Sequence, residues 1–330
     1  MSKIKKFKKI KFKIRANKSA DKLSCFESLK PGDIIDIIAP SSSTPIENLK
    51  KGIKLLESWG YRVRCEKNLL DPQIFLSNSD KKRFSSFKKA MTNKKSKAVW
   101  CLRGGYGAIR LLPDIEKMKV PRSKKILIGL SDISSLHVII NQKWNFPSLH
   151  ASLLDRLATE KLSSENILEL RQVLENPKYI TEFNNLIPLN KAAQTLKTIK
   201  SQVIGGNLSV VSSTIGTTSQ IKTKNKILFL EELNERAYRV DRFLQQMKQA
   251  GLFTQVHAVI FGDFTDCEEP NKDNHIQAVL KNFFEKLKLP AFMGVESGHD
   301  IKQRPLFFNT EAHLTGGTNA KMLVGSPFKK

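Results

Sequence analysis

The alternation of apolar runs with amphipathic, helix-like stretches between residues 33 and 144 constrains the fold more than any other feature of the chain. Residues 33–39, 98–102 and 126–130 are short runs rich in Ile, Leu, Val and Ala, which is typical of strands buried on both faces. Parallel strands require a crossover connection, and that connection is usually a helix. This order of segments therefore predicts a parallel sheet with helices on both faces.

The second half of the chain alternates again. Residues 226–231 (KILFLE) and 256–262 are strand-like, each precedes a helix-like stretch, and short strand-like segments with glycine turns follow. We therefore expect an α/β protein with a parallel N-terminal sheet domain and a smaller, β-rich C-terminal α/β domain. The expected segments are a basic tail at 1–22, a domain at 23–155, a linker at 156–200 that is helical and then irregular, and a domain at 201–330.

The formal net charge is +25, and the first 18 residues hold eight lysines and Arg15 without an acid. Such an excess attracts polyanions such as nucleic acid or anionic lipid. No aromatic RNA-binding motif or helix-turn-helix pattern accompanies it, so we predict no specific nucleic-acid partner. We expect a disordered tail rather than a membrane-binding one.

The apolar runs are all shorter than the roughly 20 residues that span a bilayer, and none follows the basic N-terminus as in a secretory signal. The four cysteines lack CxxC spacing, and Cys65 and Cys101 lie in apolar runs, as in a reducing compartment. We therefore expect a cytoplasmic protein. No Cys/His pair has the spacing of a zinc site, and neither a metal nor a cofactor is expected.

Two loops at the predicted carboxyl edge of the first sheet, where α/β proteins bind ligands, could do chemistry. Ser131 follows a strand and opens a helix-like stretch, and Gly129-Leu130-Ser131 is the first half of a GxSxG nucleophile elbow. A serine at such a turn is, however, more often a helix cap. The second loop, Arg103-Gly104-Gly105-Tyr106-Gly107, is an anion cradle, a source of oxyanion N–H groups or a tight turn.

A nucleophilic serine needs a base and a residue that orients the base. Of the six histidines, His299 lies in the turn 296–300 between short strands, from which an imidazole can reach into a cleft. Glu231 ends the apolar strand 226–231, which would place its carboxylate in a dry site suited to orienting an imidazole. The alternative is that Glu231 or Glu232 pairs with one of the many lysines.

Five motifs occur together in one order. They are RGGYG at 103–107, LIGLSDISSLH at 127–137, GGNLS at 205–209, ILFLEE with YRVDR at 227–232 and 238–242, and SGH at 297–299. The set resembles the LD-carboxypeptidase family, serine peptidases that include cytoplasmic murein tetrapeptide carboxypeptidases and microcin C immunity proteins. The resemblance extends from about residue 30 to the end of the chain.

The resemblance implies a Rossmann-like N-terminal domain that carries the nucleophile and a β-rich C-terminal domain that carries the acid and base. The nucleophile, acid and base would be Ser131, Glu231 and His299. The family commonly has His-Gly-Pro where this chain has residues 150–152 (His-Ala-Ser), a departure that leaves these three positions intact.

The implied reaction is hydrolysis of the amide between an L-centre and a C-terminal D-alanine of a murein tetrapeptide, through an acyl-enzyme, in peptidoglycan recycling. The N–H of Asp132 and an N–H of Gly104-Gly105 would meet the oxyanion, and Arg103 is a candidate for binding substrate. The expected partner is a small peptide, and a homodimer is left open. The alternatives are a microcin C-type peptidase that cleaves a peptidyl or aminoacyl nucleotide, and a non-catalytic anion-binding protein.

Overall fold

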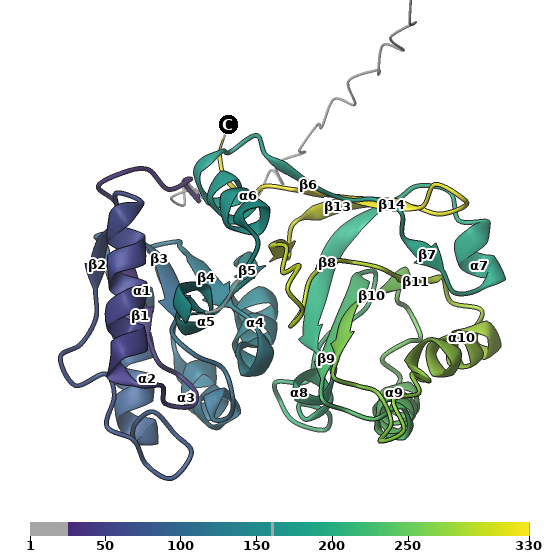
Figure 1. Ribbon diagram of the computed structural model, residues 1–330, viewed down its shortest axis with the longest axis horizontal. Coiled ribbons are helices and arrows are strands. Elements are labelled where there is room, and N and C mark those ends of the chain that lie inside the picture. Colours follow the sequence, from purple (N-terminus) through teal and green to yellow (C-terminus); the bar gives the residue numbers. More distant parts are fainter. Residues whose placement is uncertain (1–25, 160–161, 330) are drawn as a thin grey trace, which may run out of the picture.

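The structure is a computed structural model that describes residues 26–159 and 162–329. The prediction for the tail at 1–22 therefore lies outside the described residues. Two sheets lie side by side, and helices pack against each (Figure 1). The predicted α/β fold class, with a mostly parallel N-terminal sheet and a mixed C-terminal sheet, is confirmed.

The first sheet has six strands in the order β12-β5-β4-β3-β1-β2. All neighbours are parallel except the pair of β12 and β5. The strands are β1 (Ile34–Ile38), β2 (Arg62–Arg64), β3 (Ser96–Cys101), β4 (Ile126–Gly129), β5 (Ser148–His150) and β12 (Leu306–Phe308). The central strands are buried, as their apolar sequences predict.

Helices cover both faces of this sheet, as predicted. They are α1 (Ile46–Ser58), α2 (Asp80–Thr92), α3 (Leu112–Lys117), α4 (Ser134–Ile139) and α5 (Leu154–Thr159). Helix α1 contacts α5, whereas α2, α3 and α4 contact one another in series. Three short helical segments complete this half: η1 (Ala108–Leu111), η2 (Ser131–Ile133) and the π-helix η3 (Ile140–Trp144).

The second sheet has eight strands in the order β6-β14-β13-β8-β9-β10-β11-β7, and its four strands from β8 to β11 are parallel. Its strands are β6 (Ile180–Phe183), β7 (Ile187–Pro188), β8 (Ile199–Asn207), β9 (Ile227–Leu233), β10 (Ala258–Thr265), β11 (Ala291–Met293), β13 (Glu311–Thr315) and β14 (Lys321–Gly325). The remaining helices are α6 (Ser164–Glu175), α7 (Lys191–Gln194), α8 (Leu208–Ser212), α9 (Ala237–Gln249) and α10 (Ile276–Leu287). In α9, the buried residues Val240, Leu244 and Met247 recur at helical spacing, which fixes the face that packs on the sheet.

The stretch between α6 and β8 differs from the expected irregular segment. It contributes β6 and β7, and each pairs antiparallel at an edge of the second sheet. Strand β6 is only four residues long, and its sequence (Ile-Thr-Glu-Phe) does not alternate apolar and polar residues, so its local pattern does not predict a strand. Its pairing depends on the distant strand β14. Strand β12 likewise leaves the C-terminal half and pairs with β5 in the first sheet.

The two sheets are joined through α4, which contacts both β5 and β8 (Figure 1). The helix that follows Ser131 therefore packs directly against the second sheet. Within residues 26–159 and 162–329, no helix is both long and apolar enough to cross a lipid bilayer.

Candidate active site

Ser131 occupies a strained turn at the carboxyl end of β4. Leu130 is extended, with φ −147° and ψ −173°, and Ser131 follows with φ 65°. A positive φ is uncommon for a residue other than glycine, and nucleophile elbows are one place where such strain recurs. Neither η2 nor α4 has a side-chain cap hydrogen bond, and Ile133 is the residue that precedes α4. The capping alternative for Ser131 is therefore wrong.

The glycine loop at 103–107 lies directly against this turn. A Cβ built on Gly104 would lie 3.0 Å from Ser131 Cβ and 3.2 Å from its Oγ, so the Gly104 backbone contacts the serine side chain. The Ala108 N–H donates to Asp132 Oδ2 at 2.8 Å, which fastens the end of the loop to the turn. The structure thus brings Ser131, Asp132 and Gly104 together, and a side chain at position 104 would crowd the serine.

Arg103 points to the neighbouring helix. Its Nη1 lies 3.1 Å from Oδ2 of Asp155 on α5, and its side chain remains 46% exposed. Burial raises the pKa of Asp155, and the charge of Arg103 opposes that rise. Arg103 is therefore held at the rim of the site by a buried carboxylate.

Glu231 and His299 form the most buried acid–base pair of the site. His299 Nδ1 lies 2.7 Å from Glu231 Oε2, and the two residues are 6% and 0% exposed. Burial lowers the pKa of His299, but the charge of Glu231 and its hydrogen bond outweigh burial, so the pKa lies above its ordinary value. Because Nδ1 faces the carboxylate, Nε2 is the ring nitrogen left for another partner.

The alternative that a lysine neutralises Glu231 or Glu232 is wrong for the residues the structure describes. Glu232 accepts hydrogen bonds from Asn207 Nδ2 at 2.8 Å, from the Ser209 N–H at 2.7 Å and from its neighbour's N–H at 2.9 Å. Burial and the charge of Glu231 raise the pKa of Glu232 to about 7. The two adjacent carboxylates therefore serve different partners.

The turn before His299 requires glycine. Gly298 has φ 150°, and a Cβ there would lie 3.1 Å from Asp263 Oδ2 and 3.2 Å from Glu231 Oε2. Burial raises the pKa of Asp263 to about 7, and the charges of Asp300, Glu231 and Glu296 add to the rise. The backbone thus passes between two carboxylates to deliver His299 to Glu231.

A series of contacts links the serine turn to the strand that neighbours Glu231. The Asn207 N–H donates to Ser134 Oγ at 2.8 Å, and Asn207 is the register partner of Glu231 in the neighbouring strand. The turn that carries Ser131 contacts β8. From the first half of the chain, Arg156 Nη2 donates to the His299 carbonyl at 2.6 Å.

Sequence reasoning did not select Ser134, Asn207, Glu232 or Arg156 as parts of this site. Asn207 does lie in the GGNLS motif at 205–209, one of the five motifs that carry the family resemblance, so the sequence held a signal for this residue. Arg156 gives no local signal, since its contact with His299 joins residues 143 positions apart.

Two other histidines near this edge are structural. His137 Nε2 lies 2.8 Å from the Gly129 carbonyl oxygen, and burial lowers the pKa of His137 to about 4. His150 is fully buried between Phe229 and Phe308, and burial holds its pKa well below the ordinary value. Neither histidine has the carboxylate partner that distinguishes His299.

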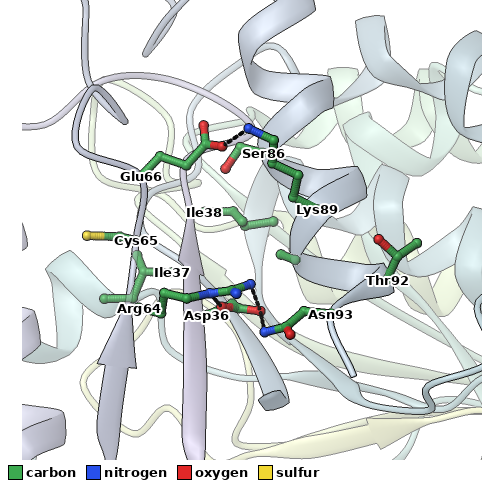
Figure 2. A pocket seen from close by; sticks show the side chains of 11 residues that line it. Asp36, Ile37, Ile38, Arg64, Cys65, Glu66, Ser86, Lys89, Thr92 and Asn93 are labelled. Carbon is green, nitrogen blue, oxygen red and sulfur yellow. Dashed lines mark hydrogen bonds and ion pairs between the residues drawn. The ribbon is translucent and has the colours of Figure 1, made fainter. Parts of the chain in front are cut away.

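A separate hollow of about 440 Å³ lies between β1, β2 and α2 (Figure 2), and none of the candidate residues lines it. Its charged groups neutralise one another. Arg64 Nε lies 2.6 Å from Asp36 Oδ1, and Lys89 Nζ lies 2.6 Å from Glu66 Oε1. Asn93 also donates to Asp36, at 3.2 Å, as Figure 2 shows. The free thiol of Cys65 also lines the hollow, and burial raises its pKa. The residues that line the hollow therefore include no acid–base pair comparable to Glu231 and His299.

Comparisons with known proteins match both halves of the chain to one family. The LD-carboxypeptidase N-terminal domain matches residues 35–151, and the LD-carboxypeptidase C-terminal domain matches residues 200–314. A Rickettsia conorii protein named "Putative carboxypeptidase RC0549" is 37% identical over 292 residues, which cover 88% of this chain and 90% of that protein. The murein tetrapeptide carboxypeptidase of Pseudomonas aeruginosa is 26% identical over 286 residues, 86% of this chain and 93% of that protein.

Solved structures share the fold. The muramoyltetrapeptide carboxypeptidase of Oxalobacter formigenes superposes with a TM-score of 0.78 at 24% identity, covering 90% of this chain and 100% of that one. The microcin C7 self immunity protein superposes with a TM-score of 0.81 at 17% identity, covering 93% of this chain and 100% of that one. At these identities the likeness establishes the fold alone.

Proposed function

Because the chain belongs to the LD-carboxypeptidase family, we propose that it is a serine carboxypeptidase that releases the C-terminal D-alanine of murein tetrapeptides. The observation that supports this proposal is the buried pair of Glu231 and His299, 2.7 Å apart. The strained turn of Ser131, which contacts strand β8 next to the strand of Glu231, adds to that support. The Pseudomonas aeruginosa relative, whose name specifies a murein tetrapeptide, supports the choice of substrate.

In the proposed mechanism, His299 Nε2 removes the proton from the Ser131 hydroxyl as Oγ attacks the carbonyl of the amide before D-alanine. Glu231 holds the proton on Nδ1 and stabilises the imidazolium that forms. The raised pKa of His299 suits this role, since a base works best when its pKa lies near the working pH. His299 then gives its proton to the departing amine of D-alanine, and water releases the acyl group from Ser131 by the same sequence.

The oxyanion of the tetrahedral intermediate needs N–H donors. We propose the N–H of Asp132, at the start of η2, and an N–H of the Gly104-Gly105 segment that lies against Ser131. Loss of one such donor typically slows turnover by roughly 100- to 1000-fold. Arg103, held at the rim by Asp155, is the proposed contact for the carboxylate of the substrate.

The test is Ser131→Ala with a defined murein tetrapeptide, with products identified by mass spectrometry. We expect D-alanine release to be abolished while thermal unfolding stays close to that of the unchanged protein. A serine-directed acylating probe should add the mass of one probe group per chain, and the label should be on Ser131. Near-normal turnover in the variant, or labelling at another serine, contradicts the assignment.

A peptidase of the microcin C immunity type is the second candidate. The observation in its favour is an exposed aromatic pair at the rim, where the ring centroids of Phe75 and Tyr106 lie 5.2 Å apart. The Tyr106 N–H donates to Ser42 Oγ at 3.0 Å, and Tyr106 lies two residues from Gly104. An exposed aromatic surface could stack on a base. Assaying the tetrapeptide and an aminoacyl nucleotide side by side, with Tyr106→Ala, separates the two reactions, since only the second should lose affinity through stacking.

A non-catalytic anion-binding protein is the remaining alternative. It predicts that inorganic phosphate binds the loop at 103–107 and that no acyl-enzyme forms with any tetrapeptide. Trapping an acyl group on Ser131 would exclude it.

A further inference from the structure

A second cavity, of about 240 Å³, lies on the seam between the two halves of the molecule and is lined by none of the residues proposed for catalysis. Its walls come from α4 and η3 on one side and from β8 and the segment 221–226 on the other. The lining residues used below are Val138, Ile204, Ile221, Lys222, Lys226 and Asn145.

The cavity and the candidate active site lie along the same two elements, α4 with its continuation η3 and strand β8. Helix α4 begins at Ser134, which contacts Asn207, and continues into η3, whose Asn141 lines the cavity. At 1.5 Å per residue, these two points are roughly 10 Å apart along the helix. The cavity is therefore separate from the serine turn but shares its supporting helix.

The charge of the cavity is positive and uncompensated. Lys222 and Lys226 both line it, and no carboxylate within the described part of the chain forms an ion pair with either ammonium group. Lys226 is half-buried and its Nζ donates to the neutral amide oxygen of Gln202. Burial alone accounts for the lowered pKa of Lys226. An ammonium group taken partly out of water without a counter-charge is costly, and an incoming anion would relieve that cost.

The cavity also has an apolar lining, which comes from both sides and is fixed in position. Val138, Ile204 and Ile221 are 4%, 6% and 3% exposed. Hydrogen bonds across the seam hold the wall in place: Gln142 Nε2 donates to the Ser219 and Gln220 carbonyls at 3.3 and 3.2 Å, and the Lys222 N–H donates back to Gln142 Oε1 at 3.2 Å. The cavity is thus preformed rather than opened by its occupant.

The backbone on the helical side of the cavity also departs from regular structure. Residues 140–144 form a π-helix, a rare conformation that recurs at functional sites, and Asn145 ends it with φ 53°. The side chain of Asn145 is held by Asn309 Nδ2, which donates to Asn145 Oδ1 at 3.0 Å. Asn309 itself has φ 60° and donates its N–H to the Val203 carbonyl, so both asparagines are pinned at the rim.

We propose that this cavity binds a small aliphatic carboxylate. Its carboxylate would lie between the ammonium groups of Lys222 and Lys226, and its short hydrocarbon chain would cover Val138, Ile204 and Ile221. The small volume favours a ligand of this size over a nucleotide or a peptide. The occupant would touch α4 and η3 from one half of the molecule and β8 from the other, and would therefore stabilise their seam.

The test uses 4-methylpentanoate as the probe and its neutral amide, 4-methylpentanamide, as the matched compound. Binding is followed by titration with methyl NMR of Val138, Ile204 and Ile221, on the full chain. We expect saturable shifts of these methyl groups with the carboxylate, and at least about tenfold weaker binding of the amide, the loss typical of one charged contact.

The chain provides its own control for the lysines. Lys224 is exposed, lies between Lys222 and Lys226 in sequence, and does not line the cavity. Lys222→Gln and Lys226→Gln should each weaken binding by about tenfold or more, whereas Lys224→Gln should leave it unchanged. Because Lys222 is exposed, Lys222→Gln keeps the test valid if Lys226→Gln unfolds the protein.

Three outcomes overturn the proposal. The first is the absence of saturable binding by the carboxylate, which would mean a cavity filled by water alone. The second is equal binding of the amide, or equal weakening by Lys224→Gln. The third is a set of shifts centred on residues around His299, which would place the probe in the catalytic cleft instead.

Discussion

Replacing Glu231 by Gln tests the proposed catalytic pair most directly. Glu231 is fully buried and accepts the hydrogen bond of His299 Nδ1 at 2.7 Å, so no solvent molecule can take the place of its carboxylate. A glutamine amide can donate to Nδ1 as well as accept from it, and it therefore no longer enforces the tautomer that leaves Nε2 as the base. Loss of the acid in comparable triads lowers kcat by roughly 10⁴-fold, which corresponds to about 5.5 kcal/mol of transition-state stabilisation.

The pH dependence of Glu231→Gln gives the sharper readout. In the unchanged protein, the charge and hydrogen bond of Glu231 raise the pKa of His299 against the effect of burial. Turnover requires the neutral imidazole, so activity should fall as pH decreases through a value above about 6.5, the unperturbed pKa of histidine. With the carboxylate removed, burial remains and the acidic limb of kcat/KM should move to lower pH.

The assay is D-alanine release from a murein tetrapeptide across the acidic and neutral range. Glu311→Gln is the matched control, because Glu311 Oε1 lies 3.0 Å from His313 Nε2 on β13, away from the site. The control should keep both the rate and the profile. An acidic limb of Glu231→Gln that stays in place or moves to higher pH would refute the reasoning, as would a rate loss below about tenfold.

Stability gives an independent check of the same pair. Since the pKa of folded His299 is raised, the pair stabilises the fold at pH below the unfolded value of about 6.5, and this contribution is lost as pH rises through the folded pKa. Thermal unfolding should therefore show a larger loss of Tm in Glu231→Gln on the acidic side than on the alkaline side. A loss that is larger at alkaline pH would contradict the assigned direction.

The remaining predictions concern the seam and a buried carboxyl. In Gly206→Ala, the new Cβ would lie 2.3 Å from Ser134 Oγ, on a backbone with φ 143°. Gly216→Ala is the control, because φ is 81° there and nothing lies within 4 Å of the new Cβ. Gly206→Ala should lower the free energy of unfolding by about 1–3 kcal/mol more than the control, and an equal loss in urea unfolding would exclude the contact as the cause. Burial and neighbouring acids raise the pKa of Asp263 to about 7, so the folded state loses stability as pH rises from the unfolded pKa of about 3.9 to 7. Asp263→Asn should remove this loss and raise the unfolding free energy above pH 7 by an amount on the order of 4 kcal/mol. An unchanged pH dependence would show that the carboxyl ionises freely.

Much of the candidate site could be predicted from short motifs because each part lies at the end of a strand or in a turn. Ser131 and the loop at 103–107 follow apolar runs, and the carboxyl ends of parallel strands meet at one edge of a sheet. The same reasoning left open whether Ser131 is a cap and whether Glu231 pairs with a lysine. Both questions depend on which groups face each side chain, and that information lies outside the local sequence.

The amino-acid sequence by itself determined the α/β class, the order of the buried strands along the chain and the positions at which backbone turns expose side chains. These properties follow from apolar periodicity and glycine placement, which act over a few residues. Only the tertiary structure decided that residues 180–183 join the second sheet, that β12 crosses to the first, and that His299 meets Glu231 across 68 positions. The physical reason is that an edge strand or a buried ion pair is stabilised by a partner far away in the chain, and neither partner's local pattern specifies the other.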